Sequence, residues 1–478
     1  MSNLSELLPS GGGQNVGSFV ASGTLTNGKP VALKTDGKVE AVFTTSNQAG
    51  SVFEVTTVAV GGPTPVSAYA TNADRMVIVY SIGGTLYYKL GEVSSFGITL
   101  GSETAIPTIS TNTSQQAICY DETSQRIVVF FKDDNNLTHG TAIAGTVSSS
   151  GITWGTAAVY NSTNTNYTIA RSGGGKVCVV FTEYHSGTGG SAILGTISGN
   201  NITFPGTRSR FIAGNANQYG LVYSEDQGNF VVFYNQGTTS AASTPLTING
   251  NNITLGSEVQ FNAQRTDYIK AAYDKTQNKT LITYLDNSTN YRGIVGTNSG
   301  TSMSFGTEAS ANAASGADDG NVVYDPHAGH CVIVFGNAAR NNELTFKPAI
   351  ISGTDVTFPS SIHVNIGVNG SYYFSLSAYT SQNKLVTTFY GASGHADGVV
   401  YQSAGTNIAN FIGITGQAIS DTATGNVDML GGINSQQTSL VIGSKYYVQS
   451  DGTLGTTVTS TFAGQAVSAT TLNIRDLT

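Results

Sequence analysis

The chain has few charged residues. Asp, Glu, Lys and Arg make up 10% of its 478 residues, whereas an ordinary globular protein has roughly 25%. Gly, Ser, Thr and Asn take their place, a mixture that many short turns and few amphipathic helices produce. The formal net charge is −8 and the sequence contains no run of Lys and Arg. We therefore expect neither nucleic acid nor an anionic membrane surface as a partner.

Long apolar segments and cysteines are scarce as well. No stretch approaches the ~20 apolar residues of a membrane-spanning helix, so we expect no membrane insertion. The N-terminus, MSNLSELLPSGGG, lacks the basic segment and apolar run of a secretory signal. The three cysteines, Cys119, Cys178 and Cys331, each lie inside an apolar run. We interpret them as buried free thiols of a protein made in a reducing cytoplasm.

A short phrase recurs along most of the chain. It reads SFGITLGSE from Ser95, SSGITWGTA from Ser149 and GNNITLGSE from Gly250, and six copies follow one another at intervals of 50 to 54 residues. A second marker runs in step, a polar turn followed by a β-branched run, as in CYDETSQRIVVFF from Cys119, and it has seven copies. A period near 50 is typical of a repeat architecture.

Each repeat reads as four short strands separated by Gly, Asn and Ser turns. Four-stranded units of this length suit the blades of a β-propeller, whereas the coils of the alternative, a parallel β-helix, are usually shorter. We therefore predict an all-β fold in which a seven-bladed β-propeller is inserted in a small split β-module. The predicted boundaries are 1–45 for the first part of the module, 46–406 for the propeller and 407–478 for the second part of the module.

The seventh repeat lacks the recurring phrase. We expect the segment Ser51–Val60 to supply its outer strand, beside Val399 and Val400, so that the ring closes without a free sheet edge. The glycine that follows each phrase, as at Gly101 and Gly155, is expected to break the outer strand where the chain crosses to the next blade.

The segments outside the repeats have their own pattern. Asn27-Gly28, Asp36-Gly37 and Asp451-Gly452 are hairpin signals. The phrases FVASGTLTNGKPVALKTDGKVEAV from Phe19, NFIGITGQAISDTATGNVDMLGGI from Asn410, and KYYVQSDGTL and AGQAVSATTLNI after it complete the pattern. Together they resemble a module of tail-fibre-like and other virion structural proteins of tailed phages, particularly marine ones. The resemblance covers about a quarter of the chain and implies a unit for virion attachment or for oligomerisation, with a homotrimer expected.

Motifs of catalysis are missing. The sequence has no P-loop, dinucleotide-binding glycine signature, nucleophile elbow or paired zinc-ligand motif, so we predict no enzyme activity, no cofactor and no metal site. His327 and His330 are interpreted as part of a turn, and the acidic loops at Lys132 and Ala317 as solvated loops rather than calcium sites. A glycan-cleaving enzyme stays as an alternative, because Arg265, Arg292 and Arg340 could share one face of the ring and clamp a carboxylate.

The loops point to a binding role. One set of connections varies in length and carries aromatic and arginine residues, and variable loops on a rigid scaffold are where binding sites tend to lie. Tyr, Arg and Asn suit the faces and hydroxyls of sugars. The predicted ligand-binding residues are Tyr184, His185, Tyr268, Tyr291, Arg292, Arg340, Tyr372 and Tyr373.

The sequence therefore predicts a non-enzymatic virion protein, made in the host cytoplasm. We expect a tail-fibre or capsid-appendage adhesin that binds host surface glycans through the loop face of the propeller. Its other partners would be neighbouring virion proteins. The alternatives are a purely structural virion component that contacts those neighbours and the glycan-cleaving enzyme.

Overall fold

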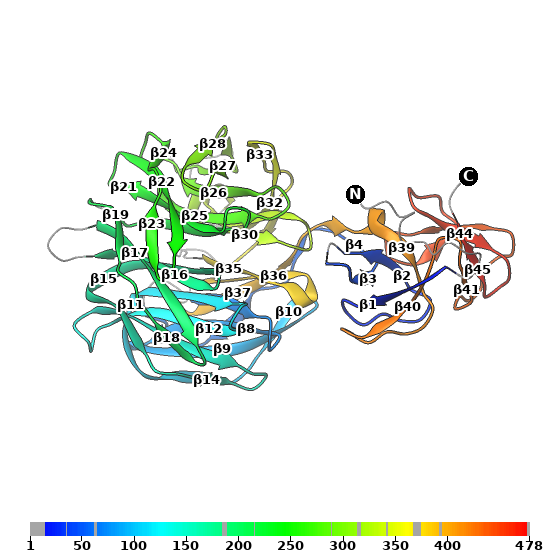
Figure 1. The fold of residues 1–478 in the computed structure, drawn as a ribbon, viewed down its shortest axis with the longest axis horizontal. Helices are drawn as coiled ribbons and strands as arrows, with labels where there is room; N and C mark the ends of the chain where they lie inside the picture. The colour runs from blue at the N-terminus through cyan, green and yellow to red at the C-terminus, as the bar shows by residue number, and fades with distance from the viewer. Residues whose placement is uncertain are drawn as a thin grey trace. The chain divides into compact units, whose positions relative to one another are not determined.

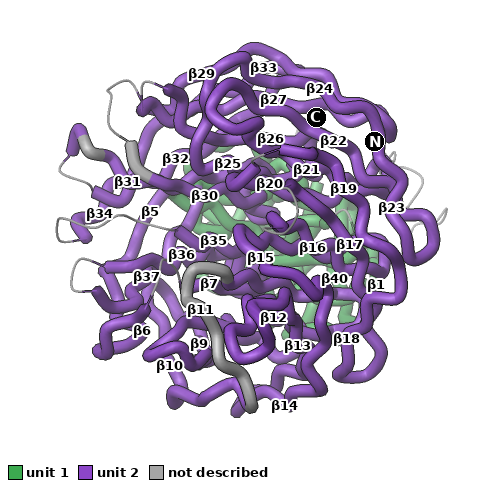
Figure 2. The backbone as a smooth tube through the Cα atoms, turned by 90° about the vertical axis from the view of Figure 1, so that its left-hand side faces the viewer, with its two compact units in different colours: residues 1–46, 404–478 green, residues 47–403 purple. Residues whose placement is uncertain are grey.

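The computed structural model describes residues 15–34, 36–61, 65–183, 189–214, 216–287, 289–312, 317–340, 343–366, 374–391 and 394–475. The chain divides into two compact units, unit 1 with residues 1–46 and 404–478 and unit 2 with residues 47–403 (Figure 2). Nearly all of the regular structure consists of antiparallel strands (Figure 1). The described residues contain no helix with the length and hydropathy that a membrane crossing requires.

The described strands of unit 2 pair into seven successive groups, which we call blades 1 to 7. The first three are β7 (Val66–Ala70), β8 (Arg75–Ile82), β9 (Thr85–Ser94) and β10 (Gly97–Leu100); β11 (Thr104–Asp121), β12 (Arg126–Asp133), β13 (His139–Val147) and β14 (Ile152–Trp154); and β15 (Ala158–Gly173), β16 (Lys176–Glu183), β17 (Gly189–Ser198), β18 (Asn201–Thr203) and β19 (Ser209–Ile212). The beginnings of β11 and β15 pair with the preceding blade, and their ends form the inner strands of blades 2 and 3.

The other four groups repeat this arrangement. They are β20 (Tyr219–Ser224), β21 (Asn229–Gln236), β22 (Ser240–Asn249), β23 (Asn252–Leu255) and β24 (Val259–Asn262); β25 (Asp267–Asp274), β26 (Lys279–Leu285), β27 (Tyr291–Asn298), β28 (Met303–Phe305) and β29 (Ala309–Ser310); β30 (Ala317–Asp325), β31 (His330–Asn337), η2 (Ala338–Arg340), β32 (Glu343–Ser352), β33 (Asp355–Thr357) and β34 (Ile362–Val364); and β35 (Phe374–Tyr379), η3 (Thr380–Gln382), β36 (Lys384–Tyr390) and β37 (Ala396–Gln402) with β5 (Gln48–Ala49) and β6 (Phe53–Thr56).

The inner strands of the blades form a closed ring. Each of β7, β11, β15, β20, β25, β30 and β35 contacts the next, and β35 contacts β7. Their labels surround the centre of Figure 2. The second strands behind them, such as β8 and β12, are buried along almost their whole length, because both faces pack against neighbouring blades. The core clusters accordingly combine residues of adjacent blades. The predicted all-β propeller class is confirmed.

The seventh blade is completed by a segment from the other end of the chain. In β6, Phe53 and Glu54 pair with Gly398 and Asp397 of β37, and in β5, Ala49 pairs with Tyr401. The outer strand predicted within Ser51–Val60 is therefore confirmed, and it extends further toward the N-terminus than we expected.

The recurring phrase forms an outer strand in each of blades 1 to 6, as predicted, but its glycine has a different role. The N–H of Gly155 still donates to Ala144 of the same blade, and the chain beyond it continues to pair with that blade. A Cβ built on Gly155 would lie 1.9 Å from the carbonyl oxygen of Asn200, in the outer turn of the next blade. The glycine thus permits close contact between blades, and the expectation that the chain crosses there was wrong.

Unit 1 contains strands from both ends of the chain. One sheet has the order β1-β40-β39-β2-β3 and another β41-β45-β44-β42-β43, and β38 pairs with β4. The elements are β1 (Val16–Val20), β2 (Pro30–Leu33), β3 (Val39–Ala41), β4 (Thr44–Thr45), β38 (Gly405–Thr406), η4 (Ile408–Asn410), β39 (Phe411–Thr415), β40 (Thr424–Met429), β41 (Ile433–Asn434), β42 (Lys445–Val448), β43 (Leu454–Gly455), β44 (Phe462–Ala466) and β45 (Leu472–Ile474).

Two of the three hairpin signals in unit 1 behave as predicted. Asp36-Gly37 joins the paired strands β2 and β3, and Asp451-Gly452 joins β42 and β43. Asn27-Gly28 does not join a hairpin, because β1 pairs with β40 and β2 pairs with β39. Strands β40 and β39 from the C-terminal segment therefore pair with β1 and β2, although the local signal predicted that β1 and β2 pair with each other.

A candidate ligand site in the central cavity

The ring of inner strands surrounds a cavity of about 630 Å³. Every blade contributes polar side chains to its wall, and the set includes Ser67, Gln116, Asn166, Asn217, Lys270, Asn321 and Ser375. A cavity of this volume can hold a small molecule or one or two sugar units. Its amide and hydroxyl groups can both donate and accept hydrogen bonds, which suits a hydroxyl-rich ligand.

Two tyrosines occupy the same position of the inner strand in blades 3 and 5. The pairing register of β15 jumps between Asn166 and Ile169, and that of β25 between Asp267 and Lys270. Tyr167 and Tyr268 lie in these bulges with positive φ angles of 49° and 53°. A bulky side chain rarely adopts this conformation, and bulges often direct a side chain into a functional site. Both tyrosines line the cavity.

A buried ion pair lies in the wall beside these tyrosines. Nζ of Lys270 is 3.6 Å from Oδ1 of Asp319, whose side chain is 3% exposed. Burial raises the pKa of Asp319 to about 6, although Lys270 and the backbone N–H of Gly320 oppose the shift. The charges of the pair largely cancel, so the pair adds dipoles rather than net charge to the cavity.

Arg171 is the other charged group of the wall. It lies on β15, and its Nε donates to the carbonyl oxygen of Leu221 in the next blade at 3.2 Å. Burial lowers the pKa of the Arg171 guanidinium. No described carboxylate forms an ion pair with it, so Arg171 gives the cavity a net positive charge.

The structure places only one of the predicted ligand-binding residues in this wall. Tyr268 lines the cavity, and it also packs against the core between blades 5 and 6. Tyr184, His185, Tyr372 and Tyr373 lie outside the described residues. Tyr291, Arg292 and Arg340 are described and lie elsewhere.

Tyr291 belongs to the core, which corrects its predicted role. Its side chain is 0% exposed, its ring stacks on Phe335 at 4.9 Å between centroids, and its hydroxyl lies 3.1 Å from Oγ1 of Thr283. It starts β27 and fills the space between blades 5 and 6, because its neighbour Gly320 leaves room for the ring. A ligand cannot reach it.

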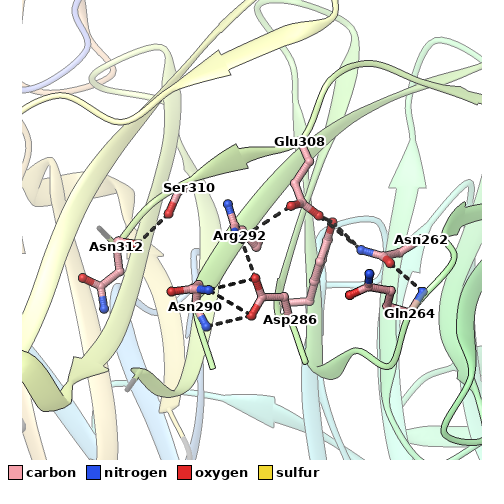
Figure 3. A network of polar contacts seen from close by, with 9 residues as sticks. Asn262, Gln264, Asp286, Asn290, Arg292, Glu308, Ser310 and Asn312 are labelled. Carbon is pink, nitrogen blue, oxygen red and sulfur yellow. Dashed lines mark hydrogen bonds and ion pairs between the residues drawn. The ribbon is translucent and has the colours of Figure 1, made fainter. Parts of the chain in front are cut away.

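Arg292 lies in a polar network that joins blades 4 and 5 (Figure 3). Its Nε is 2.7 Å from Asp286 and 3.4 Å from Glu308. Asn262, at the end of blade 4, donates to the same Glu308 at 3.2 Å. Asp286 also accepts hydrogen bonds from Asn290. Within this network, the charge of Arg292 is neutralised by residues of its own blade.

The other arginines of the predicted clamp are also paired. Nε of Arg340 lies 2.8 Å from Glu343, three residues away, and Nε of Arg265 lies 2.9 Å from Asp267. Each of these arginines is thus neutralised by a carboxylate close to it in sequence. The shared clamp that would support a glycan-cleaving enzyme does not appear among the described residues.

Sequence reasoning missed Tyr167, Arg171, Lys270 and Asp319. The sequence contains a signal for Tyr167, because Tyr167, Tyr268 and Tyr373 occupy the same position in their repeats. Arg171 is also visible as an exception, since the other blades have Ala68, Cys119, Val222, Ala272, Val323 and Ser377 at its position. The bulges that turn these residues toward the cavity have no local sequence signature.

The remaining candidate groups serve the fold. Cys119, Cys178 and Cys331 are buried free thiols, as predicted, and burial raises the pKa of Cys119 to about 12. The backbone N–H of His327 donates to Asp325 within the turn between β30 and β31. The described residues contain no group of three or more His, Cys, Asp and Glu side chains placed to hold a metal ion.

Comparison with known proteins gives a likeness of fold. No protein-family model and no curated protein matches the chain. Among solved structures, the BP39L lectin from Burkholderia pseudomallei aligns with a TM-score of 0.51 at 11% identity, covering 73% of this chain and 98% of the lectin. A variant of AofleA from Arthrobotrys oligospora aligns at 0.43 and 9% identity, covering 70% and 94%. The Dos1 propeller aligns at 0.42 and 13%, covering 75% and 95%. At 11% identity, the likeness to the BP39L lectin supports the propeller fold alone.

Proposed function

We propose that the protein is a glycan-binding adhesin whose central cavity holds the sugar. The observation that carries this proposal is the pair of tyrosines at equivalent bulges, Tyr167 and Tyr268, both lining a cavity with polar walls. A non-glycine residue with positive φ costs on the order of 1–3 kcal/mol and tends to persist at functional sites. The same unfavourable conformation at two equivalent positions favours a role in binding over an accident of packing.

The chemistry of the wall suits a saccharide. Aromatic rings can stack on the apolar face of a sugar, while the carboxamides of Gln116, Asn166 and Asn217 can bond its hydroxyls. One structural neighbour, BP39L, is a lectin. For this chain, the glycan proposal rests on the cavity and not on that name.

We further propose that unit 1 attaches the protein to a virion, as a tail-fibre or capsid appendage. The resemblance of Phe19–Val42 and Phe411–Ile474 to phage modules supports this proposal. Unit 1 also exposes apolar side chains that a partner surface could cover, namely Val441 (62%), Ile442 (68%), Val458 (74%) and Val467 (53%). Detection of the chain in purified virions, and loss of incorporation in an Ile442→Asp variant that still folds, would support attachment. A virion that never contains the chain would contradict it.

The glycan proposal can be tested with variants of Tyr167. We expect Tyr167→Gly to weaken binding on a glycan array at least tenfold, because the stacking ring is lost. The thermal midpoint should stay equal or rise, since glycine relieves the positive φ. Tyr167→Phe is the matched control, because it keeps the ring and should keep most of the affinity. Absence of any glycan binding by the folded wild-type protein would refute the proposal.

A further inference from the structure

Arg171 lines the central cavity and forms no ion pair with a described carboxylate, in contrast to several other arginines of unit 2. Arg75, Arg208 and Arg292 each form an ion pair with a carboxylate, at 2.9, 3.1 and 2.7 Å respectively. For Arg171 the structure gives one hydrogen bond, from Nε to the backbone of Leu221. Its terminal nitrogens have no partner among the described residues.

The repeat makes this departure informative. At the position of Arg171 the other six blades have Ala, Val, Cys or Ser, so neither strand pairing nor the contact between blades requires a cation. Desolvation lowers the pKa of the Arg171 guanidinium, because a low-dielectric environment disfavours the charged form. The requirements of the fold therefore do not account for an arginine at this position.

The surroundings of Arg171 leave its charge uncompensated. Lys270 is paired with Asp319 across the cavity wall, so this pair contributes little net charge. A guanidinium presents its nitrogens as a planar fork that matches the two oxygens of a carboxylate. The cavity wall thus combines a guanidinium that can pair with an anion and two tyrosines that suit a sugar ring.

We infer that the cavity recognises a saccharide unit that bears a carboxylate. The terminal nitrogens of Arg171 bind the carboxylate, while Tyr167 and Tyr268 contact the ring. The inference rests on the proposed glycan-binding function and adds the class of sugar. Recognition is non-covalent, so the ligand leaves the cavity unchanged.

The experiment compares acidic glycans with their neutral forms on the full-length protein. The probes are oligosaccharides ending in a uronic acid or a sialic acid, and the same oligosaccharides after reduction of the carboxyl group to an alcohol. We expect the wild type to bind at least one acidic probe about tenfold to a hundredfold more tightly than its reduced form, as expected for a charge-assisted pair. Excess acetate should compete with the acidic probe.

Variants of Arg171 separate this inference from the proposed function. Arg171→Gln should remove the preference for the acidic form and leave binding of the reduced form unchanged. Arg171→Lys should keep part of the preference for the acidic form. It replaces Arg171→Gln in the experiment if the glutamine variant does not fold. Arg126→Gln is the control, because Arg126 contacts Asn200 in an outer turn and lies outside the cavity wall. Equal binding of acidic and reduced probes by the wild type would overturn the inference alone, as would an unchanged preference in folded Arg171→Gln. Absence of binding to every probe would instead contradict the proposed function.

Discussion

Asp319 is a carboxylic acid held inside the wall of a cavity, and its titration should affect stability. Burial raises its pKa to about 6 from the ordinary value of 3.8. The folded state therefore binds this proton more tightly than the unfolded state does. The resulting stabilisation is complete below pH 4 and is lost as the pH rises toward and through about 6.

The first prediction concerns this pH window. Asp319→Asn keeps the shape of the side chain but cannot titrate. As the pH rises from 4 to 7, the stability difference between the two proteins should shift in favour of the variant, by up to about 3 kcal/mol for a shift of roughly two pKa units. Chemical denaturation of both proteins at several pH values measures the difference. A stability difference that does not change with pH would show that Asp319 has an ordinary pKa.

At the scale of single residues, sequence reasoning reached Tyr268 and misjudged Tyr291. Both are tyrosines near the start of a strand in blade 5, and composition does not distinguish them. A bulge turns Tyr268 toward the cavity. The side chain of Tyr291 instead lies on the face of its strand that packs into the core, where Gly320 of the next blade makes room for it. The difference depends on register and on a residue in another blade, so no local pattern could have shown it.

At the scale of strands, the repeats carry a correlated pair of side chains. Tyr80, Tyr234 and Tyr284 occupy one position of the second strand in blades 1, 4 and 5, and each hydroxyl donates to a glutamate that follows the outer strand of its blade. The other four blades have Phe at the tyrosine position and Ala157, Arg208, Ser361 or Val52 at the glutamate position. The glutamate occurs only where a buried hydroxyl needs an acceptor.

The second prediction tests this coupling in blade 5. Tyr284→Phe and Glu308→Ala should each destabilise the protein, and the double variant should lose less than the sum. We expect a coupling energy of about 1–2 kcal/mol. This value lies at the lower end of the range for hydrogen bonds to a charged acceptor, because the side chain of Glu308 is 33% exposed. Tyr284→Phe combined with Glu103→Ala of blade 1 is the control and should be additive. Additivity within blade 5 would exclude the coupling.

The third prediction concerns the glycine of the recurring phrase. A Cβ on Gly306 would lie 1.8 Å from the carbonyl oxygen of Thr354 in the next blade. Gly306→Ala should therefore force two outer turns apart and cost on the order of 1–3 kcal/mol. Gly214→Ala is the matched control, because a Cβ there has no neighbour within 4 Å. Equal thermal midpoints for the two variants would contradict this account.

At the scale of the whole molecule, periodicity predicted more than local signals did. The spacing of the recurring phrase indicated the propeller class, and the missing seventh copy indicated the segment that completes the last blade. The local signal at Asn27-Gly28 was misleading, because β1 and β2 of unit 1 pair with strands about 400 residues away in sequence. The period of a repeat can be read from the sequence alone, whereas the pairing partner of a single strand depends on tertiary packing.

The last prediction tests how the ring is held closed. In blade 7, β37 pairs with β6, which lies more than 300 residues earlier in the chain, and Glu54 lies opposite Asp397. Opening this contact would leave an unpaired strand edge, which promotes aggregation.

Cysteines in place of both residues, Glu54→Cys with Asp397→Cys, should form a disulfide across the closure. Because the bridge closes a very long loop, the oxidised form should be more stable than the reduced form by about 2–4 kcal/mol and should aggregate less on heating. The native Cys119, Cys178 and Cys331 are buried and should not compete for oxidation. Failure of the new cysteines to form a bridge in the folded protein would place the closing strand elsewhere.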